Sequence, residues 1–62
     1  MMSINEARDF FHLKPSDIVV VSGLDKMVRV ANAQISYGRG EMKARAWKTL
    51  EACKALYAVA EY

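Results

Sequence analysis

The sequence predicts a small all-α domain of three helices that associates with a second copy of itself. Apolar residues recur at helical spacing in three segments, and the last of these, residues 41–61, contains neither proline nor glycine. The 62 residues are 53% hydrophobic and 26% charged, which excludes a disordered acidic or basic tail. We therefore expect residues 1–62 to form a single small helical domain.

The size of the chain favours a homodimer. A domain this short buries only about 60% of the surface that its unfolded chain exposes, and such domains often depend on disulfides, metals or self-association. The single cysteine, Cys53, cannot form an intramolecular disulfide. Together with His12 it supplies two Cys or His ligands, whereas a structural zinc site takes four ligands of mostly these types. We therefore expect no metal and no cofactor, and we expect part of the apolar surface to face a second subunit.

A capping box indicates a helix at the N-terminus. Ser3 and Glu6 are three residues apart, so the hydroxyl and the carboxylate can each satisfy a free backbone N–H of the other residue. We expect Pro15 to end this helix, because the residue before a proline is driven out of the α region. The apolar residues that follow the cap at helical spacing are Ile4, Ala7 and Phe11.

The middle of the chain has two interpretations. Residues 18–21 are β-branched throughout, which favours a strand. With residues 22–26 as a turn, the fold would be α+β, with a short strand or hairpin in residues 17–33. A lone strand needs an edge to pair with, and a second subunit would provide one.

The helical interpretation of the middle fits the apolar pattern better. Ser22 and Asp25 have the spacing of a helix start, and Gly38 stands where a C-terminal glycine cap belongs. We therefore predict a helix over residues 24–37, with residues 18–21 as a short helix or strand before it. The apolar positions of this helix, spaced four, three and four residues apart, are Leu24, Val28, Ala31 and Ile35.

Residues 41–61 are predicted to form the third helix, after a linker made of Gly38, Arg39 and Gly40. Alanine, leucine, methionine, glutamate, lysine and arginine dominate the segment, and all of them are good helix formers. The face that we expect to be buried consists of Met42, Ala46, Thr49, Leu50, Cys53, Leu56, Tyr57 and Ala60.

The net charge of +2 arises in residues 38–62, because the first 37 residues carry equal numbers of basic and acidic groups. Cations near a helix N-terminus oppose the helix macrodipole, so they do not stabilise the helix and point to another role. The predicted partner-binding site is this basic segment with its tryptophan. It consists of Arg39, Lys43, Arg45, Trp47 and Lys48.

These residues favour a small protein–protein interaction module, an accessory or inhibitor-type protein that occupies a partner's surface. Trp47 would anchor the contact, and the cations would steer it to an acidic patch on the partner. The alternative is a DNA- or RNA-binding regulator that uses residues 39–48 on phosphates, although the total charge is far below the usual footprint. We expect no enzyme activity and no catalytic residue, because Cys53 lies on an apolar face without a predicted base.

We expect the protein to be cytoplasmic and to make no contact with a membrane. No apolar run approaches the roughly 20 residues that span a bilayer. Glu6 and Asp9 are incompatible with the basic start of a signal peptide, and a lone cysteine does not indicate an oxidising compartment.

Overall fold

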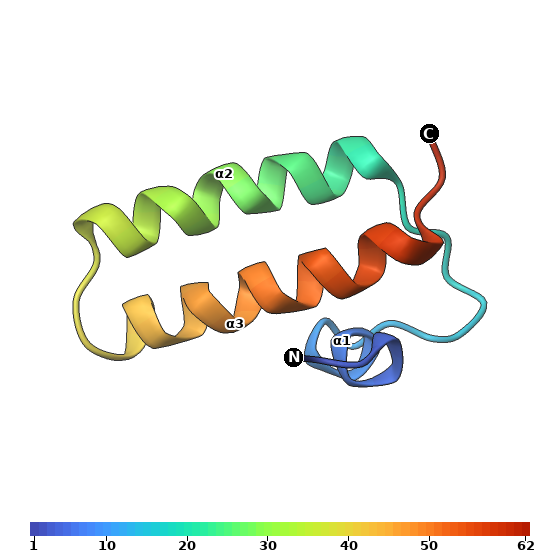
Figure 1. Ribbon diagram of the computed structural model, residues 1–62, viewed down its shortest axis with the longest axis horizontal. Coiled ribbons are helices and arrows are strands. Elements are labelled where there is room, and N and C mark those ends of the chain that lie inside the picture. Colours follow the sequence, from blue (N-terminus) through green and yellow to red (C-terminus); the bar gives the residue numbers. More distant parts are fainter.

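Three α-helices and one turn of 3₁₀-helix make up the fold in the computed structural model, which describes residues 1–62 (Figure 1). They are α1 (Ile4–Phe10), α2 (Val21–Tyr37), α3 (Glu41–Leu56) and η1 (Tyr57–Val59). Helices α2 and α3 lie side by side and run in opposite directions, while α1 lies against the C-terminal half of α3 (Figure 1). The predicted all-α class with three helices is confirmed.

The α+β alternative for residues 17–33 is wrong, because α2 begins at Val21 and continues without interruption. It starts three residues before the predicted position, so Ser22 and Asp25 lie inside the helix and do not cap it. The β-branched run therefore did not decide the local structure. Burial of the apolar stripe headed by Leu24 against α3 outweighs the intrinsic β-propensity of valine.

The C-terminal segment provides the hydrogen-bond acceptor that the N-cap residue of α2 does not provide. Val20 is the N-cap residue of α2 and offers no side-chain hydrogen bond. The N–H of Val21 instead donates to the carbonyl oxygen of Glu61 at 2.9 Å, and the N–H of Glu61 donates to the carbonyl oxygen of Val19 at 2.8 Å. A free N–H at the helix start is thereby satisfied by the main chain.

Residues 18–20 consequently form neither the predicted short helix nor a strand, but a non-helical segment with one parallel bridge between Val20 and Glu61. The pairing edge that the strand interpretation would take from a second subunit is provided here by the C-terminus of the same chain. The C-terminus passes beside the start of α2 in Figure 1.

Helix α1 begins at the predicted capping box. The Ser3 hydroxyl accepts from the N–H of Glu6 at 3.1 Å, and the Glu6 carboxylate accepts from the N–H of Ser3 at 3.4 Å. The helix ends at Phe10, so the prediction that Pro15 ends it is wrong.

A Schellman motif ends α1 before the proline is reached. His12 lies in the left-handed region with φ 57°, and its N–H donates to the carbonyl oxygen of Asp9 at 3.1 Å. The N–H of Leu13 donates to the carbonyl oxygen of Arg8 at 2.8 Å. The residue in the left-handed position is usually glycine, since a side chain there is strained.

The predicted linker of residues 38–40 joins α2 to α3. Gly38 ends α2 with φ −82°, so it is not a left-handed cap, but a Cβ there would overlap the carbonyl oxygen of Gln34. Gly40 has φ 60° and ψ −129°, a conformation that side chains rarely adopt. Both glycines are therefore needed to turn the chain back along α2.

Helix α3 ends at Leu56 and tightens into η1, so the predicted helix to about residue 61 was too long. Ala46, Cys53 and Leu56 are fully buried as predicted, but Met42 is 56% exposed and its assignment to the buried face is wrong. Ala52, which the prediction omitted, is fully buried. The predicted and observed buried residues differ because α1 and α2 contact α3 on two neighbouring faces, whereas the apolar spacing in the sequence indicated only one buried face.

The core lies where the three helices meet. Its five buried residues come from α1 (Ala7), α2 (Leu24) and α3 (Ala52, Cys53 and Leu56). Farther along the hairpin the buried residues are Ala31 of α2 and Ala46 of α3, whose small side chains allow the two helices to approach closely. Leu56 is therefore the only large aliphatic side chain that is fully enclosed, with Leu24 3% exposed, and the interior is small even for this chain.

Leu56→Ala should cost roughly 2–5 kcal/mol in the free energy of unfolding, because it removes a fully buried side chain from the centre of the core. The matched substitution Leu50→Ala should cost clearly less, because Leu50 is only half-buried. Chemical denaturation followed by circular dichroism measures both. Equal losses in the two variants would contradict the assigned core.

His12→Gly should stabilise the fold by about 1 kcal/mol, because glycine accepts the left-handed conformation without strain. For a domain of this size, that change corresponds to a rise of about 4–8 °C in melting temperature. His12→Ala serves as the control and should give no such rise. A lower melting temperature for the glycine variant would show that the His12 side chain itself is needed.

Candidate protein-binding surface

The structure divides the predicted basic segment between two flanks of α3. Lys43 and Trp47 are four residues apart and share one flank. Arg45 and Lys48 lie on the other flank, beside α1, and Arg39 lies in the linker. All five side chains are exposed, as a binding site requires, but they do not form one basic face.

The flank beside α1 uses its cations within the fold. The guanidinium carbon of Arg45 lies 5.4 Å from the centroid of the Phe10 ring, within the range of a cation–π contact. Lys48 lines a hollow with Phe10 whose border carries three acidic side chains. The positive charge of this flank is therefore partly offset locally. Those three acidic residues are Glu6, Asp9 and Glu51.

The opposite flank of α3 carries a stripe of aromatic, apolar and basic side chains, which we call the Trp47 stripe. Its members are spaced four, three, four and three residues apart, so they follow one side of the helix. Trp47 is 54% exposed, although it is the largest apolar side chain of the protein. The stripe consists of Lys43, Trp47, Leu50, Lys54 and Tyr57.

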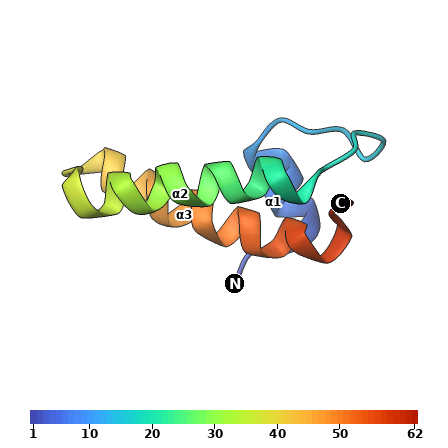
Figure 2. The same ribbon diagram turned by 90° about the horizontal axis from the view of Figure 1, so that it is seen from above.

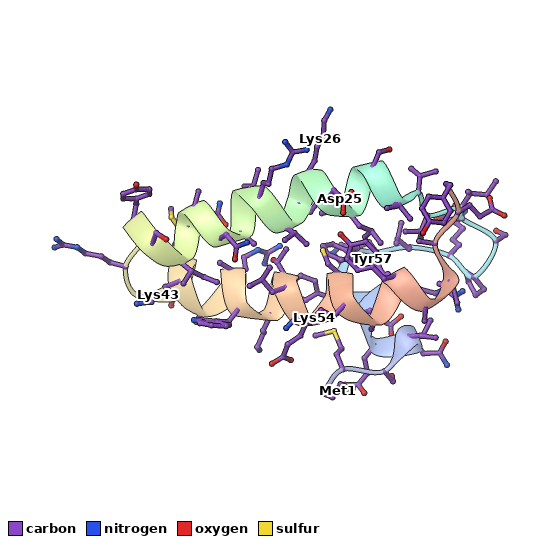
Figure 3. The ribbon with its side chains drawn as sticks, turned by 45° about the horizontal axis from the view of Figure 1, so that its top comes forward. Met1, Asp25, Lys26, Lys43, Lys54 and Tyr57 are labelled. Atoms are coloured by element: carbon purple, nitrogen blue, oxygen red, sulfur yellow. The ribbon has the colours of Figure 1, made fainter.

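Tyr57 ties the end of this stripe to α2. Its O–H donates a hydrogen bond to Oδ1 of Asp25, and the two side chains point toward one another across the hairpin (Figure 3). The bond to this carboxylate raises the pKa of Tyr57 to about 12, because it favours the protonated phenol. Lys43 and Lys54 stand at separate points along α3 and are exposed (Figure 3).

Cys53 belongs to the core rather than to a reactive site. Its side chain is fully buried, and burial raises the pKa of its thiol, which disfavours the nucleophilic thiolate. The thiol is one of the largest side chains that the core encloses completely. It therefore acts as a small apolar residue.

A second surface, which the predicted site did not include, lies on α2 and the segment before it. Apolar side chains remain exposed there, including Ile18, Val20, Met27 and Val30. Ile18, Val20 and Met27 border a groove of about 300 Å³ between residues 11–20, the start of α2 and Leu56. The signal was present in the sequence as a second apolar stripe on α2, adjacent to the one that begins at Leu24.

The structure contains no group of three or more His, Cys, Asp or Glu side chains that could hold a metal ion. None of its helices combines the length and the apolar character needed to cross a membrane. No protein-family model, curated protein or solved structure matches the chain.

Asp25→Asn should lower the pKa of Tyr57 from about 12 toward the ordinary value near 10. The folded-state value is raised, so the bond stabilises the fold fully below about pH 10 and loses its effect as the pH rises toward about 12. Titration of the Tyr57 ring signals by NMR measures the shift. Asp17→Asn, the same change at a carboxylate that does not contribute to the shift, should leave the Tyr57 titration unmoved.

Proposed function

We propose that this chain is a small protein–protein interaction module that binds an acidic surface of another protein through the Trp47 stripe. The observation that carries the proposal is the half-exposed Trp47, set on a helix flank between Lys43 and Lys54. Tryptophan and tyrosine are enriched at interfaces, because a partner can bury the ring and still leave its polar atom a hydrogen bond.

The fold presents this stripe on a rigid support. Ala46 and Cys53 are buried behind it, and the bond from Tyr57 to Asp25 ties its far end to α2. A preorganised surface loses less conformational entropy on binding than a flexible one. The two lysines on either side of Trp47 would attract carboxylates of the partner and orient the encounter. The module would act sterically, by occupying its partner's surface as an accessory or inhibitor-type protein does.

The division of the basic segment favours a protein partner over DNA or RNA. Binding to a phosphate backbone depends on several cations that neutralise successive phosphates. Arg45 and Lys48 instead lie beside α1, next to acidic groups, and leave the Trp47 flank with few cations. A single exposed indole also provides one stacking surface at most.

A photo-reactive phenylalanine analogue at position 47 should form adducts with a second protein in the native host. The same probe at Asn5, which is exposed on α1, should not form them. The double variant Lys43→Glu/Lys54→Glu should lose the adducts, whereas the matched variant Arg45→Glu/Lys48→Glu should retain them. Mass spectrometry of the adducts identifies the partner.

Three outcomes would contradict this proposal. Adducts that disappear after nuclease treatment would support the DNA- or RNA-binding alternative. Equal adducts from positions 47 and 5 would show that the contact is nonspecific. Adducts with only a second copy of this chain would place the self-contact at the Trp47 stripe. Thermal melts should confirm that each variant is folded, since the replaced side chains are exposed.

A further inference from the structure

Helix α2 carries two apolar stripes, and α3 covers only one of them. The inner stripe starts at Leu24, which is buried in the core. The second, which we call the outer seam, lies about a quarter turn around the helix, as positions spaced three and four residues apart require. The outer seam consists of Val20, Gly23, Met27, Val30, Gln34 and Tyr37.

The outer seam is uncharged, and all of its residues except the partly buried Gly23 and Gln34 are exposed. Val30 is 57% exposed and Tyr37 is 88% exposed, and none of the six residues carries a charge. The alternation of three and four residues is the heptad spacing by which one helix packs against another. Two depressions line this side of the molecule and share Met27: the apolar groove at its N-terminal end and a hollow of about 190 Å³ bordered by Val30 and Thr49.

The chain exposes more total surface than a compact protein of its mass, by an amount comparable to one side of a dimer interface. A compact monomer of 7.0 kDa exposes about 4,000 Å² of surface, whereas this chain exposes 4733 Å². The excess of roughly 700 Å² is close to the roughly 800 Å² that each partner contributes to a stable interface. The elongated α2–α3 hairpin is the source of the excess, since the molecule measures 34 × 21 × 17 Å (Figure 2).

We propose that the outer seam of α2 binds the outer seam of a second copy in an antiparallel arrangement. With the twofold axis between residues 28 and 29, Met27 faces Val30 of the second copy and Gly23 faces its Gln34. Val20 then faces Tyr37 of the second copy. Each facing pair combines a larger with a smaller side chain, as close packing of two helices requires.

The antiparallel register also fits the charges and the groove. Lys26, the charged residue on the rim of the hollow, lies level with Ala31 of the second copy in this register, and Ala33 is the nearby residue of the second copy on the same flank, so no like charges meet. The Tyr37 ring of the second copy, exposed in the single chain, comes to Val20 beside the apolar groove and fills it. The twofold axis creates this contact twice.

Sedimentation equilibrium at tens of micromolar should give twice the mass of 7.0 kDa for the unmodified chain. Val30→Glu should raise the dimer dissociation constant roughly a hundredfold, because it buries an unpaired carboxylate at the interface. Asn32→Glu adds the same charge to the same helix on the side opposite the seam, and it should remain dimeric. A monomer in the unmodified chain, or an unchanged dimer in the Val30 variant, would overturn the proposal.

Disulfide formation tests the register even if the Val30 variant fails to fold. A mixture of Val20→Cys and Tyr37→Cys chains should form a mixed disulfide between the two. Val20→Cys alone should not, because the two copies of residue 20 are about 25 Å apart along the antiparallel helices at 1.5 Å per residue. Homodisulfides of Val20→Cys would indicate a parallel pair and overturn the arrangement.

This surface is separate from the Trp47 stripe, because Thr49, which borders the hollow, lies on a different side of α3 from Trp47. The two proposals therefore fail independently. Loss of the dimer in Val30→Glu should leave adducts at position 47 intact, and Lys43→Glu/Lys54→Glu should leave the dimer intact.

Discussion

Packing of Leu56 against residues from all three helices holds this chain together. Ala7, Leu24, Ala52 and Cys53 surround it, so one contact site secures α1, the start of α2 and the end of α3. The main-chain pairing of Glu61 with the residues before α2 closes the same end of the molecule. No disulfide reinforces this arrangement, since the single cysteine is itself a free core residue. Stability is therefore concentrated at one end of the helical hairpin.

The composition of the interior explains the character of the surface. Alanine lets α2 and α3 approach closely but buries little apolar area, so the hairpin forms without enclosing its larger side chains. These side chains remain on two sides of the hairpin. One side bears Trp47 between lysines, and the other bears the uncharged outer seam of α2. The first suits an acidic partner that is reached through electrostatic attraction, whereas the second suits an apolar, self-complementary contact.

The candidate site shows how a linear cluster changes when the chain folds. Arg45 and Lys48 adjoin Lys43 and Trp47 in the sequence, yet helical geometry separates the two pairs. Because α1 covers one flank of α3, the guanidinium of Arg45 contacts the ring of Phe10 in α1. Trp47 was predicted to belong to a partner-binding group, and its ring is 54% exposed. Its neighbours in space, Leu50 and Lys54, follow from the helix rather than from the basic run.

Spacing alone predicted the helical class, the capping box at Ser3, the linker at Gly38–Gly40 and most of the buried face of α3. These features depend on interactions within a few residues, which a local pattern records. The start of α2 at Val21, the pairing of Glu61 with the segment before it and the burial of Ala52 were not predicted. Each depends on a segment distant in the chain, because Glu61 caps α2 and α1 covers Ala52. Only folding brings those groups together.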